Sequence, residues 1–337
     1  MLIKELCNLS GVSGNEGEVR NFIKEKITAF ADEIMVDTIG NLIALKKGDS
    51  SKKVMVSCHT DEVGFIVSGV NDNGFLEFKT VGGIDTRVII SKKVTVGDNK
   101  IPGVIGMKAV HLQKKSERET VPEVSSLYID IGTKTKDDAL SKVKLGDYVC
   151  FDTSFEMLCD DTFKAKAIDD RSGCAILMEL IKKPVKYDTY FCFTTQEEVG
   201  LRGARLASHR IMPDIALVIE ATTCNDVYGC EDHEYVTNIG GGAVVTFMDR
   251  TTIVDKKLRT WLFESAKSAG IPVQYKRATA GGNDAGRIHL TGAGVKTASL
   301  SVPTRYIHSP AGIASKKDIQ AVEDLAQLFL DRIDEVI

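Results

Sequence analysis

Apolar residues follow a helical spacing at the start of the chain and a strand-like spacing directly after it. Within residues 1–30, Val19 and Phe22 lie one helical turn apart. Ser13 and Asn15 precede them and are typical of a capped helix start, so a helix is predicted here. Compact apolar runs then predict strands. These runs cover residues 33–36, 42–46 and 53–58.

A different pattern, with many short strand-like runs separated by turn sequences, occupies residues 64–163. The run 65–70 ends at the turn sequence Asn71-Asp72-Asn73-Gly74, and the run 92–96 ends at Gly97-Asp98. Helical spacing is weak throughout this region. Short strands at such intervals indicate a small all-β barrel or sandwich.

Helices and strands alternate from residue 164 onward, which is typical of a mainly parallel sheet covered by helices. We therefore predict an α/β protein with a mixed, mainly parallel central sheet. Residues 1–63 and 164–337 would form one discontinuous domain, and residues 64–163 would be a small inserted β-barrel domain. The predicted helices are 171–183, 256–270 and 315–337, and the predicted strands are 189–194, 215–219 and 296–302.

Composition is that of a globular protein and excludes several classes of function. The 337 residues fit about two domains, and 43% of them are hydrophobic and 27% charged. A formal net charge of -4 leaves no basic excess to bind nucleic acid. No apolar run approaches the ~20 residues of a membrane helix, and no signal peptide is visible. The 8 cysteines form no Cys-x-x-Cys pair, so we expect reduced thiols in a cytoplasmic protein.

Candidate metal ligands gather where the predicted strands end. Ligands of open α/β sheets bind beyond the carboxyl ends of the strands, so these side chains should share one edge. Two histidines with several carboxylates suit zinc, cobalt or manganese, and bridging carboxylates can hold two ions that activate a water. The residues predict a hydrolytic metal site. They are His59, Asp169, Asp170, Glu197, Glu198, Glu220 and His308.

Several segments, spread over nearly the whole chain, resemble a known family when taken in order. They are Asp37-Thr38-Ile39-Gly40-Asn41, Cys58-His59-Thr60-Asp61-Glu62-Val63-Gly64-Phe65, Ile168-Asp169-Asp170-Arg171-Ser172-Gly173-Cys174, Thr195-Gln196-Glu197-Glu198-Val199-Gly200, Gly281-Gly282-Asn283-Asp284-Ala285-Gly286 and Pro303-Thr304-Arg305-Tyr306-Ile307-His308. The chain is similar to the dinuclear metallo-aminopeptidases of the glutamyl, or tetrahedral, aminopeptidase family. Some members of that family carry the label cellulase M or endoglucanase.

The resemblance implies two divalent metal ions per subunit, which would be zinc, cobalt or manganese. His59, Asp169 and Glu220 would hold one ion. Asp169, Glu198 and His308 would hold the other, so that Asp169 bridges the pair. Many members have aspartate at the position of Glu220, but glutamate is only one methylene longer and is also a competent ligand.

The resemblance also implies roles for residues around the metals and for the insert. Glu197 would be the general base and acid, and Asp61 would orient His59. The peptide bond between Asp169 and Asp170 would be cis. The insert would pair subunits, and dimers would assemble into a dodecamer with the shape of a hollow tetrahedron.

These observations favour an aminopeptidase that acts on short peptides, and they leave two enzyme alternatives. The same metal centre could deacylate small N-acyl compounds. The older family label suggests a glycoside hydrolase, although such enzymes need two facing carboxyl groups and no metal. A binding protein with a decayed site is disfavoured, because no expected ligand or base is missing from the sequence.

Overall fold

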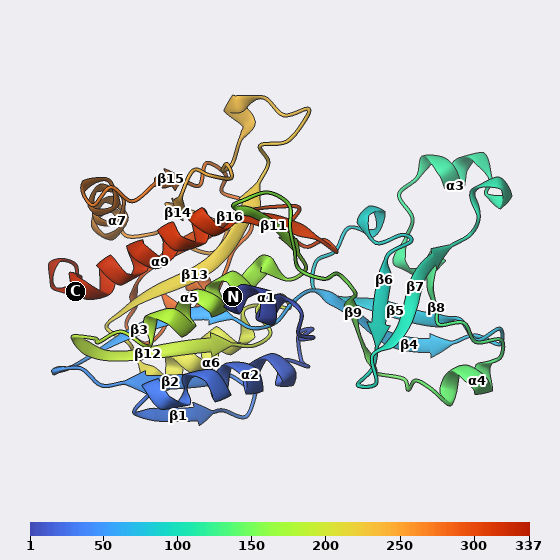
Figure 1. Ribbon diagram of the computed structural model, residues 1–337, viewed down its shortest axis with the longest axis horizontal. Coiled ribbons are helices and arrows are strands. Elements are labelled where there is room, and N and C mark those ends of the chain that lie inside the picture. Colours follow the sequence, from blue (N-terminus) through green and yellow to red (C-terminus); the bar gives the residue numbers. More distant parts are fainter.

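An open mixed sheet and a closed barrel organise the chain (Figure 1). The computed structural model describes residues 1–337, apart from the side chain of Ser51. The sheet follows the order β1-β2-β12-β3-β13-β16-β17-β11-β10, and β14 and β15 extend it beside β16. Its strands are β1 (Glu33–Val36), β2 (Leu42–Lys46), β3 (Ser50–His59), β10 (Glu156–Met157), β11 (Thr162–Ala165), β12 (Tyr187–Thr194), β13 (Ile215–Cys224), β14 (Ala243–Val245), β15 (Val273–Tyr275), β16 (Lys296–Arg305) and β17 (Gly312–Ser315).

The four central strands, β12, β3, β13 and β16, are parallel, which confirms the predicted α/β class. Their side chains alternate between two buried cores. Val54 and Val56 pack toward one face, whereas Met55 packs toward the other. Helices cover both faces, so the strands read as continuous apolar runs in the sequence.

Helices from both ends of the chain build the two covering layers. α1, α2, α5, α7 and α9 contribute to the larger core, and α6 and α8 contribute to the smaller one. Among the described residues, no helix combines the length and apolarity that crossing a bilayer would require. The helices are α1 (Leu2–Cys7), α2 (Gly17–Ile27), α3 (Lys115–Glu119), α4 (Lys136–Leu140), α5 (Ile168–Leu180), α6 (Arg202–Ile211), α7 (Lys256–Ser268), α8 (Ala285–Ile288) and α9 (Lys316–Asp331).

The barrel has a hydrophobic core of its own and forms a separate lobe beside the sheet (Figure 1). Phe65 packs edge-to-face against Phe78 and Phe151, with ring centroids 5.0 and 5.3 Å apart. The strand order is β4-β5-β8-β7-β6-β9, and the barrel closes. The strands are β4 (Gly64–Val70), β5 (Leu76–Val81), β6 (Lys93–Val96), β7 (Ile101–Met107), β8 (Leu127–Asp130) and β9 (Tyr148–Phe151).

Two expectations from the sequence need correction. The segment 1–30 forms two helices rather than one, because residues between them pair with the segment around Glu62 instead. The backbone N–H of Ser13 donates to the carbonyl of Glu62, and the N-cap of α2 is Glu16. Residues 152–163 include β10 and the start of β11, which belong to the large sheet rather than to the barrel.

A buried charge cluster fastens the N-terminal segment to the sheet domain. Lys166 Nζ lies 2.7 Å from Glu62 Oε1, and Arg171 Nη2 lies 3.2 Å from the same oxygen. The two cations also donate to the carbonyls of Leu9 and Leu6. Because Glu62 is the only acidic group in these ion pairs, it neutralises charge that the fold has already buried.

Replacing Glu62 by glutamine should therefore destabilise the protein strongly. Glu62→Gln leaves the charges of Lys166 and Arg171 without a counter-ion, a change that typically costs about 3–5 kcal/mol. The thermal unfolding midpoint followed by circular dichroism should fall sharply. Glu117→Gln, which removes the exposed partner of Lys108, should leave the midpoint unchanged. Equal midpoints for the two variants would contradict this account of the cluster.

Candidate metal centre

The parallel strands deliver the candidate ligands to one edge of the sheet. His59 is the last residue of β3, and Glu197 and Glu198 lie in the turn after β12. His308 follows β16. Glu220 was expected after its strand, but β13 runs on to Cys224, so Glu220 lies within it. The side chain still reaches the same site, because it lies 3.9 Å from His59.

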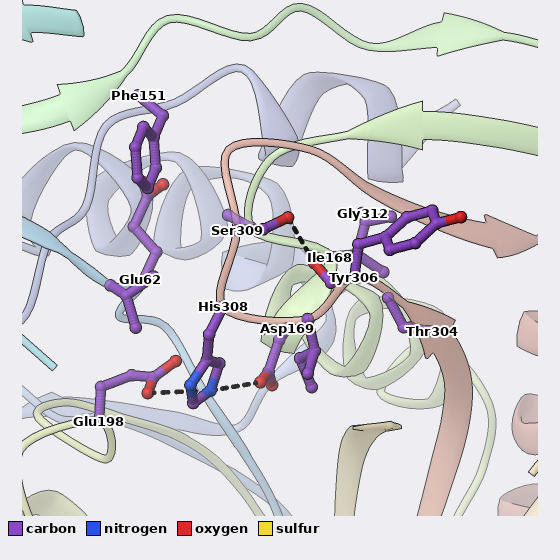
Figure 2. Close-up of a pocket in the computed structure, with 13 residues that line it drawn as sticks. Glu62, Phe151, Ile168, Asp169, Glu198, Thr304, Tyr306, His308, Ser309 and Gly312 are labelled. Carbon is purple, nitrogen blue, oxygen red and sulfur yellow. Dashed lines mark hydrogen bonds and ion pairs between the residues drawn. The ribbon is translucent and has the colours of Figure 1, made fainter. Parts of the chain in front are cut away.

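Asp169 lies between the two histidines. Its Oδ1 is 3.1 Å from His59 Nε2, and its Oδ2 is 3.3 Å from His308 Nε2. His308 Nε2 is also 3.2 Å from Glu198 Oε2, so His308 stands between the two carboxylates in Figure 2. One carboxylate whose two oxygens face two different histidines has the arrangement of a bridging ligand.

Glu220 supplies an independent sign that a cation belongs here. Its Oε1 lies 3.9 Å from His59 Nε2 and is buried without a hydrogen-bond partner. A buried carboxylate oxygen left without a partner is costly, and carboxylates in such places pair with cations or bind metals. The donor set of imidazole nitrogens and carboxylate oxygens therefore fits a divalent transition metal.

Judged only by its distance from the other candidate ligands, Asp170 could bind a metal ion as well as Asp169 could. The atoms of His59, Asp170 and Glu220 lie within 4.8 Å of one another, as do those of His59, Asp169 and Glu198. However, Asp170 Oδ1 accepts a hydrogen bond from the Gly173 N–H at 2.8 Å, and Oδ2 accepts one from the His59 N–H at 3.3 Å. Asp169 is thus the better candidate ligand. The peptide bond between the two aspartates is cis, as the resemblance implied.

The Asp61 carboxylate connects the segments that carry the candidate ligands. It accepts the N–H of Glu197 at 3.0 Å and the N–H of Glu198 at 3.1 Å. Ser13 Oγ donates to it at 2.7 Å. His59 Nδ1 lies 3.4 Å from its Oδ1 and 3.1 Å from the Asp61 carbonyl. A single buried side chain therefore fixes both glutamates and the ring of one histidine.

Asp61 remains ionised in this position. Burial acts to raise its pKa, but the hydrogen bonds from His59, Ser13 and the Glu197 backbone lower the pKa below its ordinary value. The serine was expected only as a helix cap. Its role depends on a contact between residues 48 positions apart, which no local pattern reveals.

The site holds more buried negative charge than its own cations can balance. Burial raises the pKa of Glu198 to about 8, and it raises the pKa values of Glu197 and Glu220 well above their ordinary range. Burial acts to lower the pKa of His308, but the hydrogen bond to Asp169 and the negative charges of Glu198 and Asp169 together outweigh it and raise the pKa to about 9. Added positive charge would relieve this excess.

A cleft of about 300 Å³ opens beside the cluster and is large enough for the end of a peptide. Glu197 and Glu220 lie on its wall, together with Lys276 and Asn283. Lys276 belongs to no recognisable motif, so no local sequence pattern indicates its place in the cleft. The cleft therefore borders the candidate ligands Asp169, Glu220 and His308.

Comparisons with known proteins decide the family. The family model described as M42 glutamyl aminopeptidase matches residues 40–325. The chain belongs to the M42 glutamyl aminopeptidase family. It is therefore an aminopeptidase, as the motifs indicated, and the glycoside hydrolase alternative is not supported. Metal dependence, a property of M42 enzymes, agrees with the cluster of ligands in this member.

Individual relatives agree with this assignment. The lysyl aminopeptidase of Pyrococcus furiosus is 30% identical over 342 residues, which cover 98% of this chain and 96% of the relative. The TET aminopeptidase of a marine sediment archaeon (Thaumarchaeota archaeon SCGC AB-539-E09) is 36% identical, with a TM-score of 0.95 over 98% and 95% of the two chains. The TET1 peptidase of Pyrococcus horikoshii is 32% identical, with a TM-score of 0.87 over 97% and 98%.

The contact between Ser13 and Asp61 can be tested in this M42 aminopeptidase. Ser13→Ala removes a hydrogen bond to a buried charged group, which should lower the free energy of unfolding by about 1.5–3 kcal/mol. Thermal or denaturant unfolding measures the change. Ser116→Ala, in the exposed helix α3, is the control and should have little effect. A Ser13→Ala protein as stable as the control would show that the contact contributes nothing.

Proposed function

We propose that this aminopeptidase removes N-terminal residues from short peptides with two divalent metal ions per subunit. His59, Asp169 and Glu220 would hold one ion, and Asp169, Glu198 and His308 would hold the other. The observation that carries the proposal is the position of Asp169, whose two oxygens face the two histidines. Zinc, cobalt and manganese all suit these donors.

The metals and the protein would divide the chemistry between them. Bound ions would polarise the scissile carbonyl and lower the pKa of the attacking water. Glu197 would accept the proton of that water and then donate it to the departing amine. Support comes from its place on the cleft wall, its burial and its backbone bond to Asp61. Asp61 would also hold the ring of His59 through Nδ1.

The side chains of the adjacent residues Glu197 and Glu198 face different parts of the site, so the two glutamates can take different roles. Both residues lie in the turn after β12, yet their side chains have different neighbours. Glu198 turns toward His308, whereas Glu197 lies on the cleft wall beside Asp169 and Glu220. We therefore assign Glu198 to the metal and Glu197 to the proton transfer.

Deacylation of small N-acyl compounds is the remaining alternative for the same centre. A free peptide and its N-acetylated copy separate the two activities. The proposal expects free amino acids from the unblocked peptide and none from the blocked one, followed by mass spectrometry of the products. Release of acetate from the blocked peptide with no cleavage of the free one would favour the deacylase.

We further propose that residues 1–63 and 152–337 form the catalytic domain and that residues 64–151 form the insert, which pairs subunits. The barrel strands themselves end at Phe151, which supports moving the end of the insert to that residue. Dimers formed in this way would assemble into a dodecamer. The similarity to the Pyrococcus horikoshii peptidase supports this, since that protein can assemble into a tetrahedron or a large octahedral shell.

Two matched variants test the roles of the adjacent glutamates. Glu197→Gln should keep both metal ions but lose about 10²–10⁴-fold in kcat, because a positioned general base contributes this much. Glu198→Gln should lose one ion per chain, and excess metal should restore part of its activity. Metal content by plasma mass spectrometry and kcat on a peptide report the outcome. Normal metal loading in Glu198→Gln with depleted loading in Glu197→Gln would reverse the assignment.

Removal of the metals should lower both activity and stability. A chelator would leave Glu198, Glu220 and Asp169 buried together without the ions, so their repulsion should reduce the thermal unfolding midpoint. Adding back zinc, cobalt or manganese should restore the midpoint and the turnover. The Glu197→Gln variant provides a control, because its midpoint should respond to the metals in the same way although its turnover is strongly reduced. A midpoint that is insensitive to the chelator would contradict the proposed ligand set.

A further inference from the structure

The turn that carries both adjacent glutamates, residues 195–198, is held through its backbone by side chains from the first part of the chain. We refer to these four residues as the glutamate turn. Each of their four N–H groups donates to a side-chain oxygen, at distances of 3.0–3.2 Å. The acceptor is Asn41 for the first N–H, Glu16 for the second and Asp61 for the last two. The shape of the glutamate turn therefore depends on these three side chains.

Gln196, the second residue of the glutamate turn, has a left-handed backbone conformation. Its φ is 56°, a value that residues other than glycine rarely adopt. Such a conformation persists only where the surrounding groups enforce it. The N–H that Glu16 accepts belongs to Gln196, and the next residue along the chain is Glu197. A change in the backbone of Gln196 would therefore redirect the side chain of Glu197.

The carboxylate of Glu16 is buried between the start of α2 and the glutamate turn. Glu16 is only 3% exposed, and the oxygen that faces Gln196, Oε1, also accepts the N–H of Gly14 at 2.7 Å. Gly14 has a φ of 92°, and a Cβ there would lie 2.7 Å from Oη of Tyr148 in the barrel, so a larger residue would not fit. A single oxygen thus joins two backbone segments that are 180 positions apart in the sequence.

Capping of α2 does not account for a glutamate at this position. Glu16 is the N-cap of α2, where serine, threonine, aspartate and asparagine are preferred because their short side chains accept an N–H of the first turn. The side chain of Glu16 makes no such bond to the described residues of α2. Its additional methylene, relative to aspartate, instead lets the carboxylate reach Gln196. The length of this side chain is therefore explained by the glutamate turn and not by the helix.

We propose that Glu16 is a positioning residue for the general base. Glu16 fixes the backbone of Gln196 and, through it, the direction of the Glu197 side chain. This inference rests on the proposed function, in which Glu197 accepts the proton of the attacking water. Because orientation of the base matters for the chemical step, loss of this contact should lower kcat and leave KM nearly unchanged.

Two substitutions of Glu16 separate the length of the side chain from its charge. Glu16→Asp withdraws the carboxylate from Gln196 but is a better N-cap for α2. Glu16→Gln removes the charge but keeps the length and an oxygen that can accept both N–H groups. Glu25→Ala, on the exposed side of α2, is the control. For each variant, kcat and KM on a peptide, the metal content and the thermal unfolding midpoint are measured.

The expected result is a loss of turnover that does not follow stability. Glu16→Asp should lose up to about 10²-fold in kcat, because a shift of about 1 Å in a catalytic group can cost this much. Its KM, its metal content and its unfolding midpoint should change little, since the new helix cap offsets the lost bond. Glu16→Gln should keep most of the turnover, and Glu25→Ala should keep all of it.

The same substitution in the Glu197→Gln protein identifies the residue through which Glu16 acts. Once the base is gone, Glu16→Asp should cause no further loss in kcat, because residues that act as a unit have non-additive effects. An equal fold-loss in both backgrounds would show that Glu16 supports the fold in general and does not position the base.

Other outcomes would overturn the inference in different ways. Unchanged kcat in folded Glu16→Asp would show that the contact with Gln196 has no effect on the base. A Glu16→Gln protein as slow as Glu16→Asp would assign the effect to charge instead of position. Failure of Glu16→Asp to fold, or its loss of metal, would show a structural or ligand-holding role. Full turnover in Glu197→Gln would instead reject the proposed function itself.

Discussion

Buried negative charge at the carboxyl edge of the parallel strands is the constraint that shapes the rest of the molecule. Asp169, Glu198 and Glu220 converge there from three different parts of the chain, together with two histidines. Carboxylates brought this close repel one another unless protons or cations are shared among them. The fold therefore needs rigid support around the site, and divalent cations would offset the repulsion among the carboxylates.

That support comes from hydrogen bonds that cross long sequence distances. Asp61 holds the backbone of both adjacent glutamates, and Ser13 holds Asp61 from the N-terminal segment. The neighbouring residue, Glu62, joins the same segment to Lys166 and Arg171. Contacts of the segment between α1 and α2 thus support the site. These contacts explain why the segment is not helical.

The insert contributes to the site as well as forming its own barrel. His308 Nδ1 lies 3.1 Å from the carbonyl of Gly83, in the segment between β5 and β6. An orientation of this kind keeps Nε2 directed at Asp169 and Glu198. The two lobes are therefore connected through a candidate ligand, and a change in how the insert sits would reach the metal centre directly.

The sequence by itself determined the class of the fold and the edge on which the chemistry lies. Apolar runs such as 53–58 and 215–219 indicated strands buried on both faces, because the spacing of apolar residues along the chain reflects which side chains are buried. The motifs also indicated the aminopeptidase family and named the candidate ligands. Boundaries were less certain where pairing overrides local preference, as in residues 1–30 and in β10.

Only the tertiary structure decided which polar groups face one another. It separated Asp169 from Asp170 and gave Ser13 a partner 48 positions away. The spacing of residues along the chain indicates whether a side chain is buried. It does not indicate which distant atom forms a hydrogen bond with a buried polar group. Those partners follow from the packing of strands and helices that are remote in sequence, and so they appear only when the chain is folded.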